Sequence, residues 1–169
     1  MHETPEELEE LQALIDRSMD GMAEHMARIF TPGLRLSARQ VVAYVSGITQ
    51  LAVATVTEKG EPRVSPVDAF FYRGRFWFGT SPRSRRAVHL RARPAVSATY
   101  FVGDELAIVV HGTAAIVERD DAGAKEVDEA ATAVFGWSPF AAGPGAIMIR
   151  IDPTSMYTRA ARPDDYPEG

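Results

Sequence analysis

Residues 76–94 read Phe-Trp-Phe-Gly-Thr-Ser-Pro-Arg-Ser-Arg-Arg-Ala-Val-His-Leu-Arg-Ala-Arg-Pro. An aromatic, strand-forming run ends at Gly79 and is followed by residues that favour turns and helix starts. The short helix that follows carries Arg83, Arg85 and Arg86 around its first turn. The free N–H groups of a helix start, the helix dipole and guanidinium groups all attract anions. This stretch therefore predicts a strand, turn and helix that together bind a phosphate-bearing ligand.

The overall composition excludes several classes of protein. The chain has 169 residues, a net charge of −5 and no cysteine, so disulfides, thiolate catalysis and cysteine-ligated metals are excluded. Its four histidines show no metal-ligand spacing, and no metal site is predicted. The acidic balance argues against a general nucleic-acid binder. No apolar run approaches the ~18 residues of a membrane span, and the acidic N-terminus does not resemble a signal peptide, so we expect a cytoplasmic protein without membrane contact.

The sequence predicts two helix starts before residue 49. Thr4 and Glu7 form a capping-box pattern, and an apolar stripe from Leu8 to Ile29 then predicts one helix that runs to about Phe30. Ser37–Gln40 repeats the capping pattern and predicts a second, shorter helix. We expect residues 1–48 to form an N-terminal helical extension of one domain, 1–169. A stripe of this kind packs on its own domain or on a second subunit, and a dedicated partner-binding helix is the alternative.

From residue 50 onward the apolar period becomes that of strands. Strands are expected at 51–57, 62–72, 76–80, 95–102, 106–118, 146–151 and 156–158. Gly112 predicts a bulge or bend inside the fifth of them. A further helix is expected within 120–137. The pattern predicts a mainly β (α+β) fold, a six- to seven-stranded antiparallel split β-barrel with N-terminal helices and short flanking helices.

Three motifs between Leu51 and Glu118 carry a resemblance to a known family. They are Gly60–Val67, Thr80–Arg86 and Pro94–Ser97, in this order and spacing. With them the chain resembles the FMN-binding split barrels related to pyridoxamine 5′-phosphate oxidase, a family that also includes deazaflavin-dependent reductases.

The resemblance implies the cofactor, its contacts and an assembly. It implies FMN held at the interface of a homodimer. The residues expected to bind the phosphate are Arg63, Ser84, Arg85 and Arg86. Those expected beside the ring and ribityl chain are Val64, Ser65 and Thr80.

The resemblance also implies a flavin-dependent oxidoreductase that acts on a small organic substrate, with NAD(P)H as a second electron carrier. Neither the substrate nor a catalytic residue is identifiable from the sequence. Ala107 stands where the oxidase itself carries a ring-contacting glutamine, so oxidation of vitamin B6 is not expected.

Other functions on this fold remain open from the sequence. One is a reductase that uses the deazaflavin coenzyme F-420, whose charged tail would follow the basic residues of Arg83–Arg93. Another is a non-catalytic flavin- or haem-binding protein, for which His111 or His89 is the candidate axial ligand. A third is a barrel without a cofactor that acts as an interaction module through the helix Leu8–Ile29.

Overall fold

A computed structural model describes residues 3–168. Its strands are β1 (Thr49–Val56), β2 (Pro62–Tyr72), β3 (Arg75–Thr80), β4 (Ala95–Val102), β5 (Leu106–Val117) and β6 (Ile147–Ala160). Its α-helices are α1 (Pro5–Asp20), α2 (Glu24–Ala27), α3 (Ala38–Tyr44), α4 (Arg85–Ala92) and α5 (Ala124–Phe135). Short 3-10 turns lie at Pro32–Leu34, Pro139–Ala141 and Pro163–Asp165. None of the helices within 3–168 has the length and apolar content that a membrane crossing requires.

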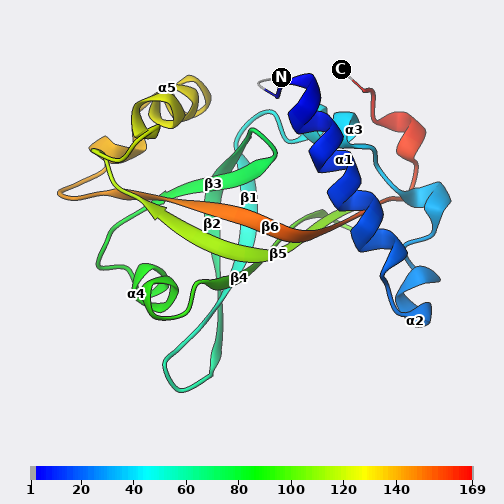
Figure 1. Ribbon diagram of the computed structural model, residues 1–169, viewed down its shortest axis with the longest axis horizontal. Helices are drawn as coiled ribbons and strands as arrows, with labels where there is room; N and C mark the ends of the chain where they lie inside the picture. The colour runs from blue at the N-terminus through cyan, green and yellow to red at the C-terminus, as the bar shows by residue number, and fades with distance from the viewer. Residues whose placement is uncertain (1–2, 169) are drawn as a thin grey trace.

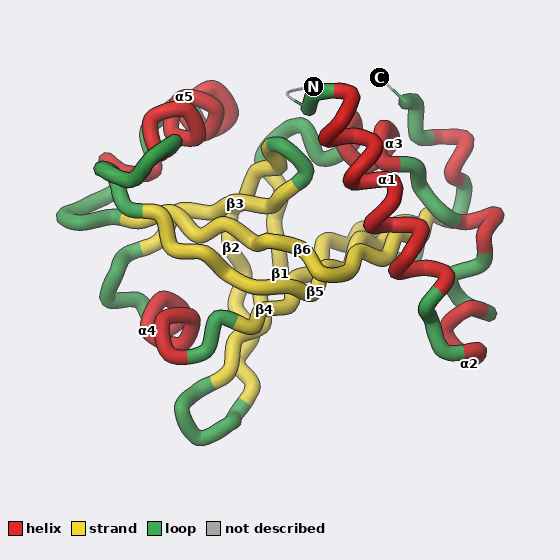
Figure 2. The backbone as a smooth tube through the Cα atoms, in the orientation of Figure 1, coloured by secondary structure: helices red, strands yellow, loops and turns green. Residues whose placement is uncertain are grey.

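The six strands form a closed antiparallel barrel in the order β1-β2-β3-β6-β5-β4, as Figures 1 and 2 show. The predicted split barrel with flanking helices is thereby confirmed. All of β1 pairs with residues 62–69 of β2. β3 pairs with β2 only from Ala69 to Tyr72. Among the described residues, one edge of 62–68 therefore carries no neighbouring strand. This edge, which we call the open edge of β2, is the split in the barrel.

The sequence predicts two strands after residue 145, but the structure has one, β6, which pairs with β3 at its start and with β5 along most of its length. Pro153 lies inside it, although proline cannot donate to a strand ladder. The ladder absorbs this defect by a register shift between His111 and Gly112, where Gly112 faces Pro153 and His111 faces Ser155. The Thr154 hydroxyl donates to the His111 carbonyl at 3.1 Å. An irregularity is present at Gly112, as predicted, but the extra residue is Thr154, so the bulged strand is β6 and not β5.

The first helix is shorter than its apolar stripe predicts. The capping box of Thr4 and Glu7 is present, but α1 ends at Asp20, and the N–H of Gly21 bonds back to the Arg17 carbonyl. Residues 24–27 form the separate turn α2, which has no capping side chain and no buried residue. Gly21 caps the helix without entering the left-handed region (φ −83°, ψ 1°), and the apolar spacing that continues beyond it does not restart α1. The prediction of one helix to Phe30 is wrong.

Helix α1 packs against β6 and contributes to the barrel core. Leu11, Ile15 and Met19 on α1 are buried in the same apolar cluster as the barrel interior. The Ser18 hydroxyl donates to the Leu14 carbonyl and accepts from the Met156 N–H at 2.9 Å, so helix and strand are also joined by a buried polar contact.

The other helices cover the remaining openings. The predicted capping box of Ser37 and Gln40 starts α3. Helix α5 covers a second apolar cluster that includes Phe70 and Trp77. Helix α4 follows β3 and carries the arginines of the opening motif, and Figure 1 shows it on the side of the barrel away from α1. The candidate site thus has a fixed β framework beneath it.

We expect Gly112→Ala to destabilise the fold. A Cβ atom at this position would lie 2.1 Å from the Asp152 carbonyl oxygen, so the β5–β6 ladder has to shift. Overpacking of this kind costs roughly 1–3 kcal/mol in the free energy of unfolding, measured by urea denaturation. Gly143→Ala is the matched control, because a Cβ there meets nothing within 4 Å. Equal stability of the two variants would contradict the account of the bulge.

Candidate functional site

The turn from β3 into α4 brings together four of the residues predicted to bind the cofactor. Ser84 is the N-cap of α4, and its hydroxyl accepts from the Ala87 N–H. Thr80 ends β3 and donates to the Ser84 hydroxyl at 3.0 Å. Arg86, in the first turn of α4, reaches back across this turn to Thr80 and to Ser65 on β2. Residues distant in sequence therefore meet at one point.

Arg86 is the centre of this network. Its Nε and Nη2 atoms donate to the Ser65 hydroxyl at 3.1 and 3.0 Å, and its Nη1 donates to the Thr80 hydroxyl at 3.2 Å. The Nη2 atom also lies 3.4 Å from the Pro66 carbonyl oxygen. The guanidinium carbon lies 5.8 Å from the centroid of the Phe78 ring. These contacts fix the plane of the guanidinium.

The charge of Arg86 is incompletely balanced by the protein. Its side chain is half-buried, and this burial lowers its pKa from the ordinary arginine value. Arginine nevertheless stays protonated in proteins. Within residues 3–168 no carboxylate forms an ion pair with it, and its partners are two hydroxyls and a carbonyl. A half-buried cation held in this way is suited to binding an external anion.

Two further arginines predicted to bind phosphate face the same surface but stand apart from this network. Arg63 forms an ion pair with Glu61 at 2.7 Å and donates to the Pro62 carbonyl. The exposed side chain of Arg85 makes no hydrogen bond or ion pair with any described residue. The structure places both beside Arg86 without direct contact to it, so three guanidinium groups line one surface.

These residues line a groove of about 720 Å³, which we call the arginine groove. It lies between the β1–β2 turn and α4. Its lining is Thr55, Thr57, Glu58, Lys59, Glu61, Arg63, Val64, Ser65, Arg85, Arg86, Val88, His89 and Ala92. Thr80 and Ser84 lie behind it, where they orient Arg86. All seven predicted cofactor residues thus lie in the groove or directly behind it, and their role as cofactor contacts stays a prediction.

His89 is named in the sequence analysis only as a candidate haem ligand, but the structure places it in the arginine groove. Its Nδ1 lies 3.0 Å from the hydroxyl of Thr55, a buried residue of β1. A usable signal existed, because His89 follows Arg85 by four positions and such residues share one face of a helix. The partner on β1 was not predictable from that spacing.

Val64 and Ser65 also line a second hollow, of about 400 Å³, on the outer face of the barrel. Val64 is 68% exposed, although it is an apolar residue in a strand. Phe101 lines the same hollow and is 60% exposed. The open edge of β2 therefore separates a basic groove from an apolar hollow, and residues of this edge line both.

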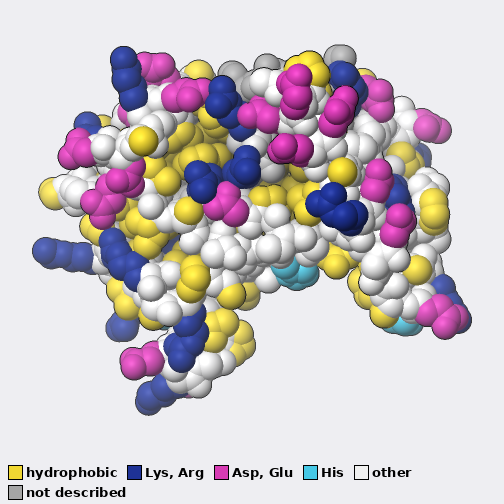
Figure 3. Space-filling model, in the orientation of Figure 1, with side chains coloured by type: hydrophobic (Ala, Val, Ile, Leu, Met, Phe, Trp, Pro, Cys, Tyr) yellow, Lys and Arg dark blue, Asp and Glu magenta, His cyan; other side chains and the backbone are white. Residues whose placement is uncertain are grey.

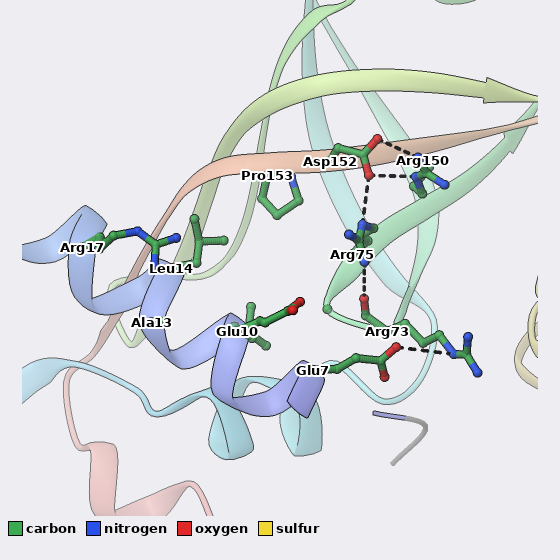
Figure 4. A pocket seen from close by; sticks show the side chains of 12 residues that line it. Glu7, Glu10, Ala13, Leu14, Arg17, Arg73, Arg75, Arg150, Asp152 and Pro153 are labelled. Carbon is green, nitrogen blue, oxygen red and sulfur yellow. Dashed lines mark hydrogen bonds and ion pairs between the residues drawn. The ribbon is translucent and has the colours of Figure 1, made fainter. Parts of the chain in front are cut away.

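A third pocket, of about 570 Å³, lies between α1 and the β2–β3 turn and serves as a contrast (Figure 4). Three of the arginines that line it are paired with carboxylates, whereas Arg17 has no ion pair among the described residues. Arg75 and Arg150 both bond to Asp152 at 2.9 and 2.8 Å, and Arg73 bonds to Glu126 at 2.8 Å. These ion pairs join β3 to β6 and the β2–β3 turn to α5, so carboxylates of the chain balance these three arginines, unlike Arg86.

The sequence of this chain matches a family model. The model described as pyridoxamine 5′-phosphate oxidase matches residues 37–160. The chain belongs to the pyridoxamine 5′-phosphate oxidase family. A search of curated proteins found no match.

Solved structures agree with this family at the level of the fold. The family member described here is similar to the conserved hypothetical protein Rv2991 from Mycobacterium tuberculosis, with a TM-score of 0.67 and 19% identity over 80% of this chain and 92% of that one. It is similar to HutZ, a haem storage protein from Vibrio cholerae, with a TM-score of 0.63 and 19% identity over 71% and 92%. It is also similar to an F420 reductase, with a TM-score of 0.54 and 20% identity over 68% and 94%.

We expect Arg86→Met to change the free energy of unfolding by less than about 1 kcal/mol. The substitution removes hydrogen bonds to two hydroxyls, but it also removes a desolvated charge. Phe78→Ala is the control at the same place, because Phe78 is fully buried beneath Arg86 and its loss costs roughly 3–5 kcal/mol. Urea denaturation of both variants measures the difference. A loss of several kcal/mol in Arg86→Met would assign this arginine to the fold instead of to a ligand.

Proposed function

We propose that this chain binds FMN and acts as a flavin-dependent oxidoreductase on a small organic substrate. The observation that carries the proposal is the half-buried Arg86, which lies on a groove and has no carboxylate partner among the described residues. A phosphate monoester supplies the missing negative charge and accepts bidentate hydrogen bonds from a guanidinium. Membership in the pyridoxamine 5′-phosphate oxidase family supports the same cofactor class.

The residues of the arginine groove fit a phosphate. Arg86 and Arg85 lie in the first turn of α4, and Arg63 lies opposite them on β2. The helix start adds favourable dipole interaction. Two or three charge-assisted hydrogen bonds contribute about 1.5–3 kcal/mol each, whereas nanomolar affinity needs about 12 kcal/mol. A second, apolar contact area is therefore required for tight binding.

The open edge of β2 supports that second contact. Val64 and Ser65 line both the arginine groove and the apolar hollow beside it, so a ligand with a phosphate at one end and a planar ring at the other has a suitable surface on each side. FMN supplies hydride and electron transfer when bound. In this proposal the chain's own residues hold the phosphate, cover one side of the ring and exclude water from it.

Exposed apolar side chains support a homodimer with the cofactor at the subunit interface. Val64 is 68% exposed, Phe101 60% and Ile48 56%. Isolated exposed apolar residues are ordinary, but Val64 and Phe101 line one hollow beside the arginine groove. A second subunit that covers this hollow would supply the apolar contact area that tight binding requires in addition to the phosphate contacts. In this proposal two composite sites form per dimer.

Coenzyme F-420 is the second candidate cofactor on the same fold. Support for it comes from the similarity to an F420 reductase and from Lys59 and Arg85, which lengthen the basic lining of the groove. The absorbance spectrum of the purified protein separates the two, because flavin gives two bands and the deazaflavin a single blue-shifted band. The mass of the chromophore released on denaturation names it.

A non-catalytic haem- or flavin-binding protein is the third candidate. The similarity to the haem storage protein HutZ supports it, together with His111 and His89. Each histidine has one ring nitrogen bonded to a hydroxyl, and the other is available. A Soret band that is lost in His111→Ala or His89→Ala would favour haem over FMN.

A comparison of FMN with riboflavin tests the leading proposal. Arg86→Ala should weaken FMN binding by roughly 10- to 150-fold, the equivalent of one charge-assisted contact. The same variant should leave riboflavin binding unchanged, because riboflavin lacks the phosphate. Quenching of flavin fluorescence measures both dissociation constants.

Arg83→Ala is the matched control for this test. Arg83 lies three residues earlier, is exposed and does not line the arginine groove, so its removal should leave both affinities unchanged. If Arg86→Ala lost affinity for FMN and riboflavin equally, the substitution would have disturbed the whole binding site, and Arg86 would not recognise the phosphate specifically. Unchanged FMN binding in Arg86→Ala would reject the proposed site.

A further inference from the structure

A separate apolar pocket of about 290 Å³ lies between the α1–α2 segment and strands β5 and β6. We call it the α2 pocket. Its lining is Gly21, Met22, Ala23, Met26, Phe30, Val109, His111 and Tyr157. None of these residues lines the arginine groove. The pocket is large enough for a ligand at the small end of the usual range for organic molecules.

The walls of the α2 pocket are suited to a planar ring. Phe30 and Tyr157 meet edge to face with centroids 6.5 Å apart, and His111 and Tyr157 do so at 5.9 Å. Met22 and Met26 add thioether side chains, which are flexible and make favourable contacts with aromatic rings. Three rings and two methionines around one space favour an aromatic ligand.

Two side chains in this lining each have a hydrogen-bonding atom that no described residue pairs with. The Tyr157 hydroxyl has no hydrogen-bond partner among the described residues. His111 uses its Nδ1 in a 2.7 Å contact with the Ser97 hydroxyl, which leaves its Nε2 available. A phenol always has a proton to donate, so Tyr157 is the candidate donor to a ligand in this pocket. A carbonyl oxygen on the ligand is the complementary group.

The lining also selects the charge of the ligand. No Asp, Glu, Lys or Arg lines the α2 pocket, so the lining offers a charged ligand no ionic partner. An anionic ligand such as haem, with its two propionates, would find no cation in this lining. A neutral molecule is the better match.

The α2 segment offers a route of entry. Helix α2 has four residues, no capping side chain and no buried residue, and Met26 is 40% exposed. A segment with so few buried contacts opens at low cost compared with the barrel. Figure 3 shows the surface hollowed between the β1–β2 turn at the lower left and α2 at the lower right, so this side of the molecule is accessible.

Strand register connects the α2 pocket with the open edge of β2. His111 pairs with Ser97, Ser97 with Ala54, and Ala54 with Val64. Directly paired residues share one face of a sheet, and their neighbours Val110, Ala98 and Val53 are buried inside the barrel. The outer face thus carries a row that crosses three strand spacings, about 14 Å. Its two middle residues, Ala54 and Ser97, have small side chains.

We infer that the α2 pocket binds a neutral, planar aromatic molecule whose carbonyl oxygen accepts a hydrogen bond from the Tyr157 hydroxyl. That this molecule is the substrate of the oxidoreductase rests on the proposed function. Binding itself does not, because the α2 pocket is formed by residues outside the arginine groove.

Coumarin is a suitable probe, since it is neutral, planar and carries one ring carbonyl. We expect calorimetric titration of the full chain to show one coumarin site. Ala23→Trp fills the pocket and should abolish the signal, while Ala122→Trp, at an exposed position outside the pocket, should leave it unchanged. Tyr157→Phe should weaken binding about fivefold, the effect of one neutral hydrogen bond, whereas Tyr166→Phe should not.

Ligand charge gives the second arm of the test. Coumarin-3-carboxylate has the same ring system with an added charge and should bind at least tenfold more weakly. The inference is overturned if Ala23→Trp retains the coumarin site, if Tyr157→Phe binds coumarin as tightly as the parent, or if the carboxylate binds as well as coumarin. A Soret band with added haem that disappears in His111→Ala would also overturn it. Coumarin titration needs no flavin, so failure of FMN binding leaves this result interpretable.

Discussion

The charge of Arg86 is the constraint on which the candidate site depends. A guanidinium that is half-buried without a carboxylate must be held by dipoles, and here the hydroxyls of Ser65 and Thr80 and the Pro66 carbonyl do so. These partners come from β2 and β3, while Arg86 begins α4. One side chain therefore ties two strands to a helix and leaves a positive charge directed at a groove. The ion-paired arginines near α1 show the alternative arrangement, in which carboxylates of the chain balance the charge.

Local chemistry explains why much of the fold is predictable from the sequence. Both capping boxes, at Thr4 and Ser37, are short-range patterns whose partners lie three residues apart. The strand periods and the irregularity at Gly112 are likewise local. The failures arise where a local pattern and the folded structure disagree. The apolar stripe continues through Met22 and Met26 although α1 stops before Gly21, and Pro153 suggests a break in a strand that its pairing with β5 carries through.

The residues of the candidate site likewise fall into a group that is predictable from the sequence and a group that is not. The residues of the β3–α4 turn are close in sequence, so their convergence at Ser84 and Arg86 follows from a strand, a turn and a helix. The resemblance to a known family added Arg63 and Ser65 from β2. The ion pair of Arg63 with Glu61, the contact of His89 with Thr55 and the whole α2 pocket were not predictable, because each depends on side-chain placement or on elements that meet only in the closed barrel.

The open edge of β2 also affects how readily the protein aggregates in concentrated solution. Unpaired backbone groups on a strand edge invite another chain to add a strand, which leads to aggregation. This edge carries Pro62 and Pro66, which have no N–H to offer, and the charged side chains of Arg63 and Asp68. Proline and charge are the usual protection of such edges. The residues of the open edge of β2 therefore protect it against strand addition by a neighbouring molecule.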